Sequence, residues 1–106
     1  QGRSSPPGAQ QVMLRWRVSA DDELTRIGQE IAQHNPNAAD NLEHRVHKFV
    51  QHLSEFPDAG RMGRVNGTRE LVISDYPYIV VYRIKDGRID VLGVRHAARQ
   101  WPTEIA

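Results

Sequence analysis

The chain has 106 residues, 25% of them charged and 39% hydrophobic, which is enough for one compact domain with a single core. It contains no cysteine, so disulfides, thiolate zinc sites and cysteine nucleophiles are excluded. The formal net charge of +1, taken alone, argues against a strongly basic nucleic-acid binder. No apolar run approaches the roughly 20 residues of a membrane span, so we expect a soluble, cytoplasmic protein with no membrane partner.

The first twelve residues are rich in glycine, proline, serine and glutamine and have almost no apolar side chains. Such a segment buries too little surface to offset its ordering entropy. We therefore predict that residues 1–12 are a flexible extension, either native or added ahead of Met13, and that residues 13–106 are the folded domain.

A strand and two amphipathic helices are predicted next. Residues 14–18 alternate apolar and basic side chains, as a half-buried strand does. Ser19 is suited to cap a first helix that ends near His34, whereas Asn35 and Pro36 suit the cap and first position of a second helix. The second helix has the stronger apolar stripe, formed by Leu42, Val46, Phe49, Val50 and Leu53.

The rest of the chain predicts three antiparallel strands. Residues 68–74 alternate in character, residues 78–84 are rich in β-branched and aromatic side chains, and residues 89–94 form the last strand. Asp86-Gly87 between the last two is a strong hairpin signal. The expected fold is α+β: an N-terminal strand, a helical hairpin and a three-stranded antiparallel meander, with the helices packed on one face of the sheet.

The near-neutral total charge hides a segregation along the chain. Residues 61–99 contain eight basic and four acidic side chains, a net +4, whereas residues 14–60 contain five basic and eight acidic ones, a net −3. Because the local charge sets the surface potential, the second half is a candidate surface for a polyanion.

The histidines do not predict a metal site. His44 and His47 lie three positions apart, but they fall opposite the apolar stripe of their helix, with no carboxylate on that face to complete a ligand set. A solvated helix face is the better interpretation, and His34 and His52 are interpreted as boundary residues. We expect no metal and no cofactor.

Two interpretations of the basic strands stay open. Arg69 or Glu70 could converge with Arg83 and His96 at a sheet face or rim, with Arg99 beyond, as general acid–base groups or phosphate contacts. Ordinary cross-strand pairing, such as Arg83 with Asp90, would explain the same pattern. Core packing is favoured over base stacking for the tyrosines, and an anchoring role for the tryptophans: Tyr76, Tyr78, Tyr82, Trp16 and Trp101.

Three segments together resemble the RelE/ParE superfamily, the toxins of type II toxin–antitoxin (plasmid stabilization) modules. They are Gly67-Thr68-Arg69-Glu70-Leu71-Val72-Ile73, residues 76–84 (YPYIVVYRI) and residues 89–102 (IDVLGVRHAARQWP). The upstream strand and helices fit as well, so the resemblance spans about residues 13–102. The combined pattern is fairly specific, although each segment alone is weak.

The resemblance implies a small α+β toxin that a cognate antitoxin neutralises, in a toxin–antitoxin hetero-oligomer. RelE-like members cleave messenger RNA on the ribosome without a metal, and ParE-like members poison DNA gyrase. Ile79 stands where the nucleases often carry an arginine, and the lysines that some place before the sheet are absent, with Arg61 and Arg64 in that region.

If the nuclease interpretation holds, the resemblance offers a catalytic set of His96, Arg99, Arg83 and Glu70. The corresponding contacts to nucleic acid or target are Arg61, Arg64, Arg69 and Arg95. Two alternatives to a toxin remain: a non-catalytic nucleic-acid-binding module that uses the basic sheet and C-terminal segment, and an inert interaction domain.

Overall fold

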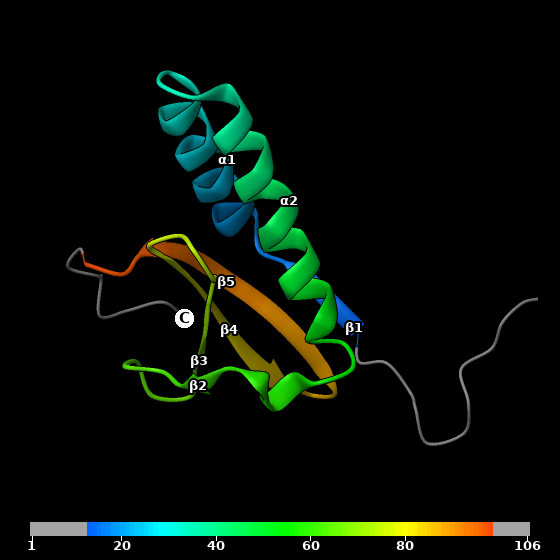
Figure 1. Ribbon diagram of the computed structural model, residues 1–106. Coiled ribbons are helices and arrows are strands. Elements are labelled where there is room, and N and C mark those ends of the chain that lie inside the picture. The colour runs from blue at the N-terminus through cyan, green and yellow to red at the C-terminus, as the bar shows by residue number, and fades with distance from the viewer. Residues whose placement is uncertain (1–12, 99–106) are drawn as a thin grey trace, which may run out of the picture.

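Two helices cover one face of a five-stranded mixed sheet in the computed structural model of the chain, which describes residues 13–98 (Figure 1). This arrangement confirms the predicted α+β class, with the helices on one sheet face. The predictions for residues 1–12, Arg99 and Trp101 lie outside the described residues. The elements in chain order are β1 (Met13–Trp16), α1 (Val18–Ala32), α2 (Pro36–His52), the 3₁₀ turn η1 (Pro57–Ala59), β2 (Arg61–Met62), β3 (Arg69–Val72), β4 (Tyr78–Lys85) and β5 (Arg88–His96).

The strands are ordered β1-β5-β4-β3-β2 across the sheet. The predicted meander is β3–β4–β5, which is antiparallel throughout. β1 adds to it in parallel beside β5, with Leu14 opposite Ile89. β2 pairs with β3 and was not predicted, because two residues are too few to show a period.

The β4–β5 hairpin is the longest pairing in the sheet, running from Tyr78 opposite His96 to Lys85 opposite Arg88. Its turn residues Asp86 and Gly87 have φ angles of 53° and 74°. Positive φ at both central positions is what a two-residue hairpin turn of type I′ requires, so the prediction from Asp-Gly is confirmed.

The helix starts were predicted correctly in one case and incorrectly in the other. Asn35 caps α2, accepting a hydrogen bond from the Ala38 N–H at 3.1 Å, and Pro36 follows at the first helical position. Ser19, in contrast, lies inside the first turn of α1. The backbone N–H of Arg17 still bonds to Val91 O at 3.0 Å, extending the β1–β5 pairing, so the helix begins at Val18 immediately afterwards.

The main core lies between the helices and the sheet. Trp16 packs against it and its ring lies 5.0 Å from that of His47, which confirms the expected anchor for the first strand. Tyr82 is fully buried in the neighbouring cluster with Leu53 and Ile89, so its predicted core role is also confirmed. The main cluster consists of Ala20, Leu24, Leu42, Val46, Val50, Ile73, Val80, Val91 and Val94.

The opposite side of the sheet, called the open face below, has a small apolar centre of its own. Ile79, Val81 and Leu92 form this second cluster, and Val65 packs against it. Glu70 of β3, Arg83 of β4 and Asp90 of β5 alternate with helix-facing residues of their strands and therefore lie on this face. Along the described part of the chain, no helix is long and apolar enough to cross a membrane.

Candidate functional site on the open face

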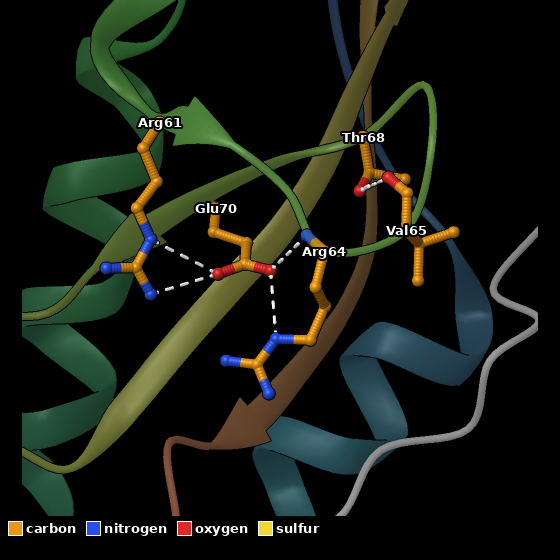
Figure 2. Close-up of polar contacts among 5 residues, drawn as sticks. All are labelled: Arg61, Arg64, Val65, Thr68 and Glu70. Atoms are coloured by element: carbon orange, nitrogen blue, oxygen red, sulfur yellow. Dashed lines mark hydrogen bonds and ion pairs between the residues drawn. The ribbon is translucent and has the colours of Figure 1, made fainter.

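A buried carboxylate between two arginines organises one end of the open face (Figure 2). Glu70 of β3 is only 3% exposed. Its Oε1 accepts hydrogen bonds from Nε and Nη2 of Arg61, at 3.2 and 3.0 Å. Its Oε2 accepts the backbone N–H of Arg64 at 2.9 Å and the Arg64 Nε at 3.2 Å. Both oxygens of the carboxylate are thus engaged in holding β2 and the following loop to β3.

These contacts decide the protonation state of Glu70. Burial alone would raise the pKa of this carboxyl, but the hydrogen bond from the Arg64 backbone and the Arg61 guanidinium outweigh it. The net pKa of Glu70 is lowered from its ordinary value. An ionised carboxylate with both oxygens occupied is poorly suited to take a proton from a substrate.

The loop beside this ion pair is fixed by its own contacts. Thr68 Oγ1 donates to Val65 O at 2.6 Å, as Figure 2 shows. The Gly63 N–H donates to Thr68 O at 2.8 Å. A Cβ on Gly63 would lie 2.3 Å from Thr68 Oγ1, so only glycine allows this close approach. The loop thereby holds Val65 against the apolar centre of the open face.

A second buried carboxylate lies at the other end of the face. Asp90 is 5% exposed and accepts from Arg83 Nε at 3.2 Å and from Arg88 Nε at 3.0 Å. The Arg83–Asp90 pair is the cross-strand interaction that the sequence suggested. Burial would raise the pKa of Asp90, but hydrogen bonds from the two guanidinium groups lower it overall.

A third arginine reaches the same place from β1. Arg15 lies directly opposite Asp90 in the β1–β5 pairing. Together with Arg17, Trp16 and Val18, these residues line a hollow of about 270 Å³. Sequence reasoning missed the contribution of β1. The alternation of Arg15 with Leu14 and Trp16 indicates that Arg15 faces the opposite side of the sheet from these two residues. Nothing in the sequence indicates that β1 pairs in parallel with β5.

His96 does not join the other candidate catalytic residues. It lies opposite Tyr78 at the far end of the β4–β5 hairpin, with the two rings in edge contact at 5.3 Å. Its Nδ1 accepts the Ala98 N–H at 3.1 Å. At about 3.3 Å per residue, His96 is about 20 Å along β5 from the rung of Arg83 and Asp90, and about 10 Å from the rung of Glu70.

Arg69 is on the helix side of the sheet, paired with Tyr82. Its Nη1 donates to Gly60 O at 2.7 Å, and the Tyr82 hydroxyl donates to Pro57 O at 2.6 Å while accepting the Gly60 N–H at 2.9 Å. Burial raises the pKa of Tyr82. These two side chains hold η1 in place, so neither projects from the open face.

Arg95 joins the sheet to the helical layer. Its guanidinium contacts the carboxylate of Glu23 on α1, and Glu23 also accepts the Val94 N–H at 3.0 Å. Burial lowers the pKa of Arg95. Glu23 therefore satisfies a backbone donor of β5 beyond the end of β1, a role that its position in the sequence did not reveal.

A groove of about 540 Å³ runs between α2 and the β3 side of the sheet. Arg45 borders it, bonding to Asp75 at 2.9 Å and lying 5.7 Å above the ring of Tyr76. His44 and His47 are exposed as predicted, although His44 lines this groove and His47 contacts Trp16. The full lining combines a basic rim with an apolar floor: Asn41, His44, Arg45, Lys48, Phe49, His52, Ala59, Leu71 and Tyr76.

Within residues 13–98, no three histidine, aspartate or glutamate side chains are grouped so that they could hold a metal ion. The buried carboxylates Glu70 and Asp90 are each surrounded by arginines, which repel a cation.

The comparisons with known proteins agree with this architecture. The family model of the ParE toxin of type II toxin–antitoxin system, parDE, matches residues 14–101. Y4kP of Sinorhizobium fredii, a protein named as a toxin, is 43% identical over 84% of this chain and 92% of its own length. Toxin RelE2 of Caulobacter vibrioides is 38% identical over 84% of this chain and 97% of its own.

Solved structures show the same fold. The chromosomal ParDE system from P. aeruginosa contains a chain that superposes with a TM-score of 0.73 and 24% identity, covering 81% of this chain and 96% of that one. The RelBE2 complex of Mycobacterium tuberculosis matches with a TM-score of 0.54 and 23% identity, over 85% and 95% of the two chains.

The match to the family model covers most of the folded domain, and it defines the class of protein. The chain belongs to the ParE toxin family, within the RelE/ParE superfamily that its strand motifs resemble. It is a toxin of a type II toxin–antitoxin system.

Proposed function

We propose that the chain inhibits growth by binding DNA gyrase, without cleaving RNA, and that a cognate antitoxin neutralises it. The observation that carries the choice of gyrase is the separation of the candidate catalytic groups. Glu70 is fully engaged by Arg61 and Arg64, and His96 lies about 20 Å along the sheet from Arg83. Metal-independent cleavage of RNA needs a base, an acid and a cation around one phosphate.

The groove beside α2 supports the antitoxin part of the proposal. Its floor of Phe49, Leu71 and Tyr76 offers apolar contact, and its rim carries Arg45 and Lys48. An amphipathic segment with acidic side chains along one edge would bury its apolar face there and pair with the rim. Two of the matching proteins, ParDE and RelBE2, are toxin–antitoxin systems by name.

Inducible expression with and without the cognate antitoxin tests this function. Expression alone is expected to arrest growth and to produce gyrase-linked DNA breaks while messenger RNA stays intact, and antitoxin is expected to relieve both effects. Because His96 has no catalytic role in this proposal, the His96→Ala variant should arrest growth as the parent does. Messenger cleavage at the ribosome that disappears in His96→Ala would establish the nuclease instead. Harmless expression of folded protein would refute a toxin.

A further inference from the structure

We propose that the hollow between β1, α1 and the β4–β5 hairpin binds the phosphate backbone of duplex DNA. The inference deepens the gyrase proposal and rests on it, because gyrase holds duplex DNA and a toxin bound there can contact both. The charged residues that line this hollow are four arginines and a single carboxylate: Arg15, Arg17, Arg83, Arg88 and Asp90.

The ion pairs with Asp90 leave part of each guanidinium of Arg83 and Arg88 available. Arg83 and Arg88 each approach Asp90 through Nε, one to each carboxylate oxygen. In these two ion pairs the terminal amino groups of both guanidiniums are left for another acceptor. Asp90 itself is buried, whereas the two arginine side chains are 25% and 27% exposed. Arg15 is exposed and has no ion pair with a described residue. Asp90 thus positions cations that point outward with most of their donors available.

The spacing of the arginines favours an extended polyanion over an acidic peptide. Arg15 and Arg83 lie on the strands either side of Asp90, so their backbones are about 10 Å apart, and Arg88 is displaced about 7 Å along β5. Duplex DNA carries one negative charge for about every 1.7 Å of its axis, so a row of this width meets several phosphates. A peptide would have to place several carboxylates at matching intervals.

The rest of the open face continues the same charge. Arg83 is two residues from Val81, which faces Glu70, so the Arg61–Glu70–Arg64 cluster begins about 7 Å further along the sheet. The helical layer behind the sheet has the opposite sign, since residues 18–52 contain three basic and six acidic side chains. A polyanion is therefore drawn to the open face and repelled from the helices.

Fluorescence anisotropy with a labelled duplex oligonucleotide, measured over a range of salt concentrations, tests the inference on the purified chain. Arg15→Gln is the key variant, because the exposed side chain holds no described ion pair. We expect its affinity to fall about 3- to 10-fold, equally for different sequences, and the slope of log affinity against log salt to fall by about 1. Arg15→Lys keeps the charge and should restore the slope.

Arg26→Gln is the matched control, since Arg26 is an exposed arginine of α1 outside the hollow. It should bind duplex as the parent does, and circular dichroism confirms that each variant is folded. The inference is overturned if Arg15→Gln keeps the parent's affinity and salt slope, or if only an acidic peptide or single-stranded RNA binds. Unchanged duplex binding together with gyrase-linked breaks removes the inference and leaves the gyrase proposal. Reduced duplex binding by Arg15→Gln together with messenger cleavage by the parent supports the DNA contact and refutes the gyrase proposal.

Discussion

Glu70 shows how one side chain can be read as catalytic from the sequence and act structurally in the fold. It lies in a family-like motif, and the resemblance placed it in a candidate catalytic set with His96, Arg99 and Arg83. In the structure Arg61 and Arg64 take both of its oxygens, and their side chains are 57% and 45% exposed while its own is 3% exposed. The carboxylate therefore fixes where Arg61 and Arg64 stand on the open face.

Replacing Glu70 by glutamine should lower the stability of the fold in a pH-dependent way. At neutral pH we expect a loss of about 1–3 kcal/mol in the free energy of unfolding, because the charge-assisted hydrogen bonds weaken. The folded-state pKa of Glu70 lies below its ordinary value of 4.5, so the ionised pair stabilises the fold above that value. This stabilisation is lost as the pH falls through the lowered pKa.

The measurement is urea unfolding of the parent and Glu70→Gln between neutral and acidic pH. The difference between the two should shrink below about pH 4.5. Glu30→Gln removes an exposed carboxylate of α1 and serves as the control, with little change at any pH. An equal pH dependence for Glu70→Gln and the parent would contradict the role assigned to the pair.

At the scale of elements, the features that the sequence predicts correctly are those that depend on residues close together in the chain. The second helix was predicted from its Asn-Pro start and apolar stripe, and the β4–β5 hairpin from Asp-Gly, and both are confirmed. The partner of β1 and the strand β2 depend on contacts between distant segments, so no local period announces them. The same holds for Arg15 beside Asp90 and for Glu23 beneath β5, each set by the pairing of remote residues. Ser19 lost its expected cap role because the strand pairing continued to Arg17.

The cap of α2 provides a test at this scale. Asn35→Ala removes the side-chain acceptor for the Ala38 N–H and should cost about 1 kcal/mol in the free energy of unfolding. Asn37→Ala, two positions later on the exposed surface of the helix, should be neutral or slightly stabilising because alanine is the better helix former. Thermal unfolding followed by circular dichroism measures both. Equal losses in the two variants would mean that the cap contributes nothing specific.

At the scale of the whole molecule, the two proposed binding surfaces lie on different layers of the fold. The acidic helical hairpin presents the basic-rimmed groove at its border with the sheet, whereas the open face carries the arginine clusters. The proposed antitoxin segment and the proposed DNA contact thus occupy different sides of one sheet. The antitoxin would then neutralise the toxin by blocking the approach to gyrase or by changing the sheet through the shared core. It would not occupy the arginines of the proposed DNA contact.

The second route, a change passed from the groove to the open face through the core, requires that the helices and the sheet unfold as one unit. A pair of valine substitutions tests this requirement. Val46 of α2 is fully buried in the core, whereas Val72 of β3 is 49% exposed. Val46→Ala should lower the free energy of unfolding by about 1.5–3 kcal/mol, and Val72→Ala by less than about 1 kcal/mol. In urea, the helical circular dichroism signal and the tryptophan fluorescence should shift together in Val46→Ala, because the core joins α2 to β4 and β5 and Trp16 packs against it. Separate transitions, with the helices lost before the sheet, would show that the layers are independent.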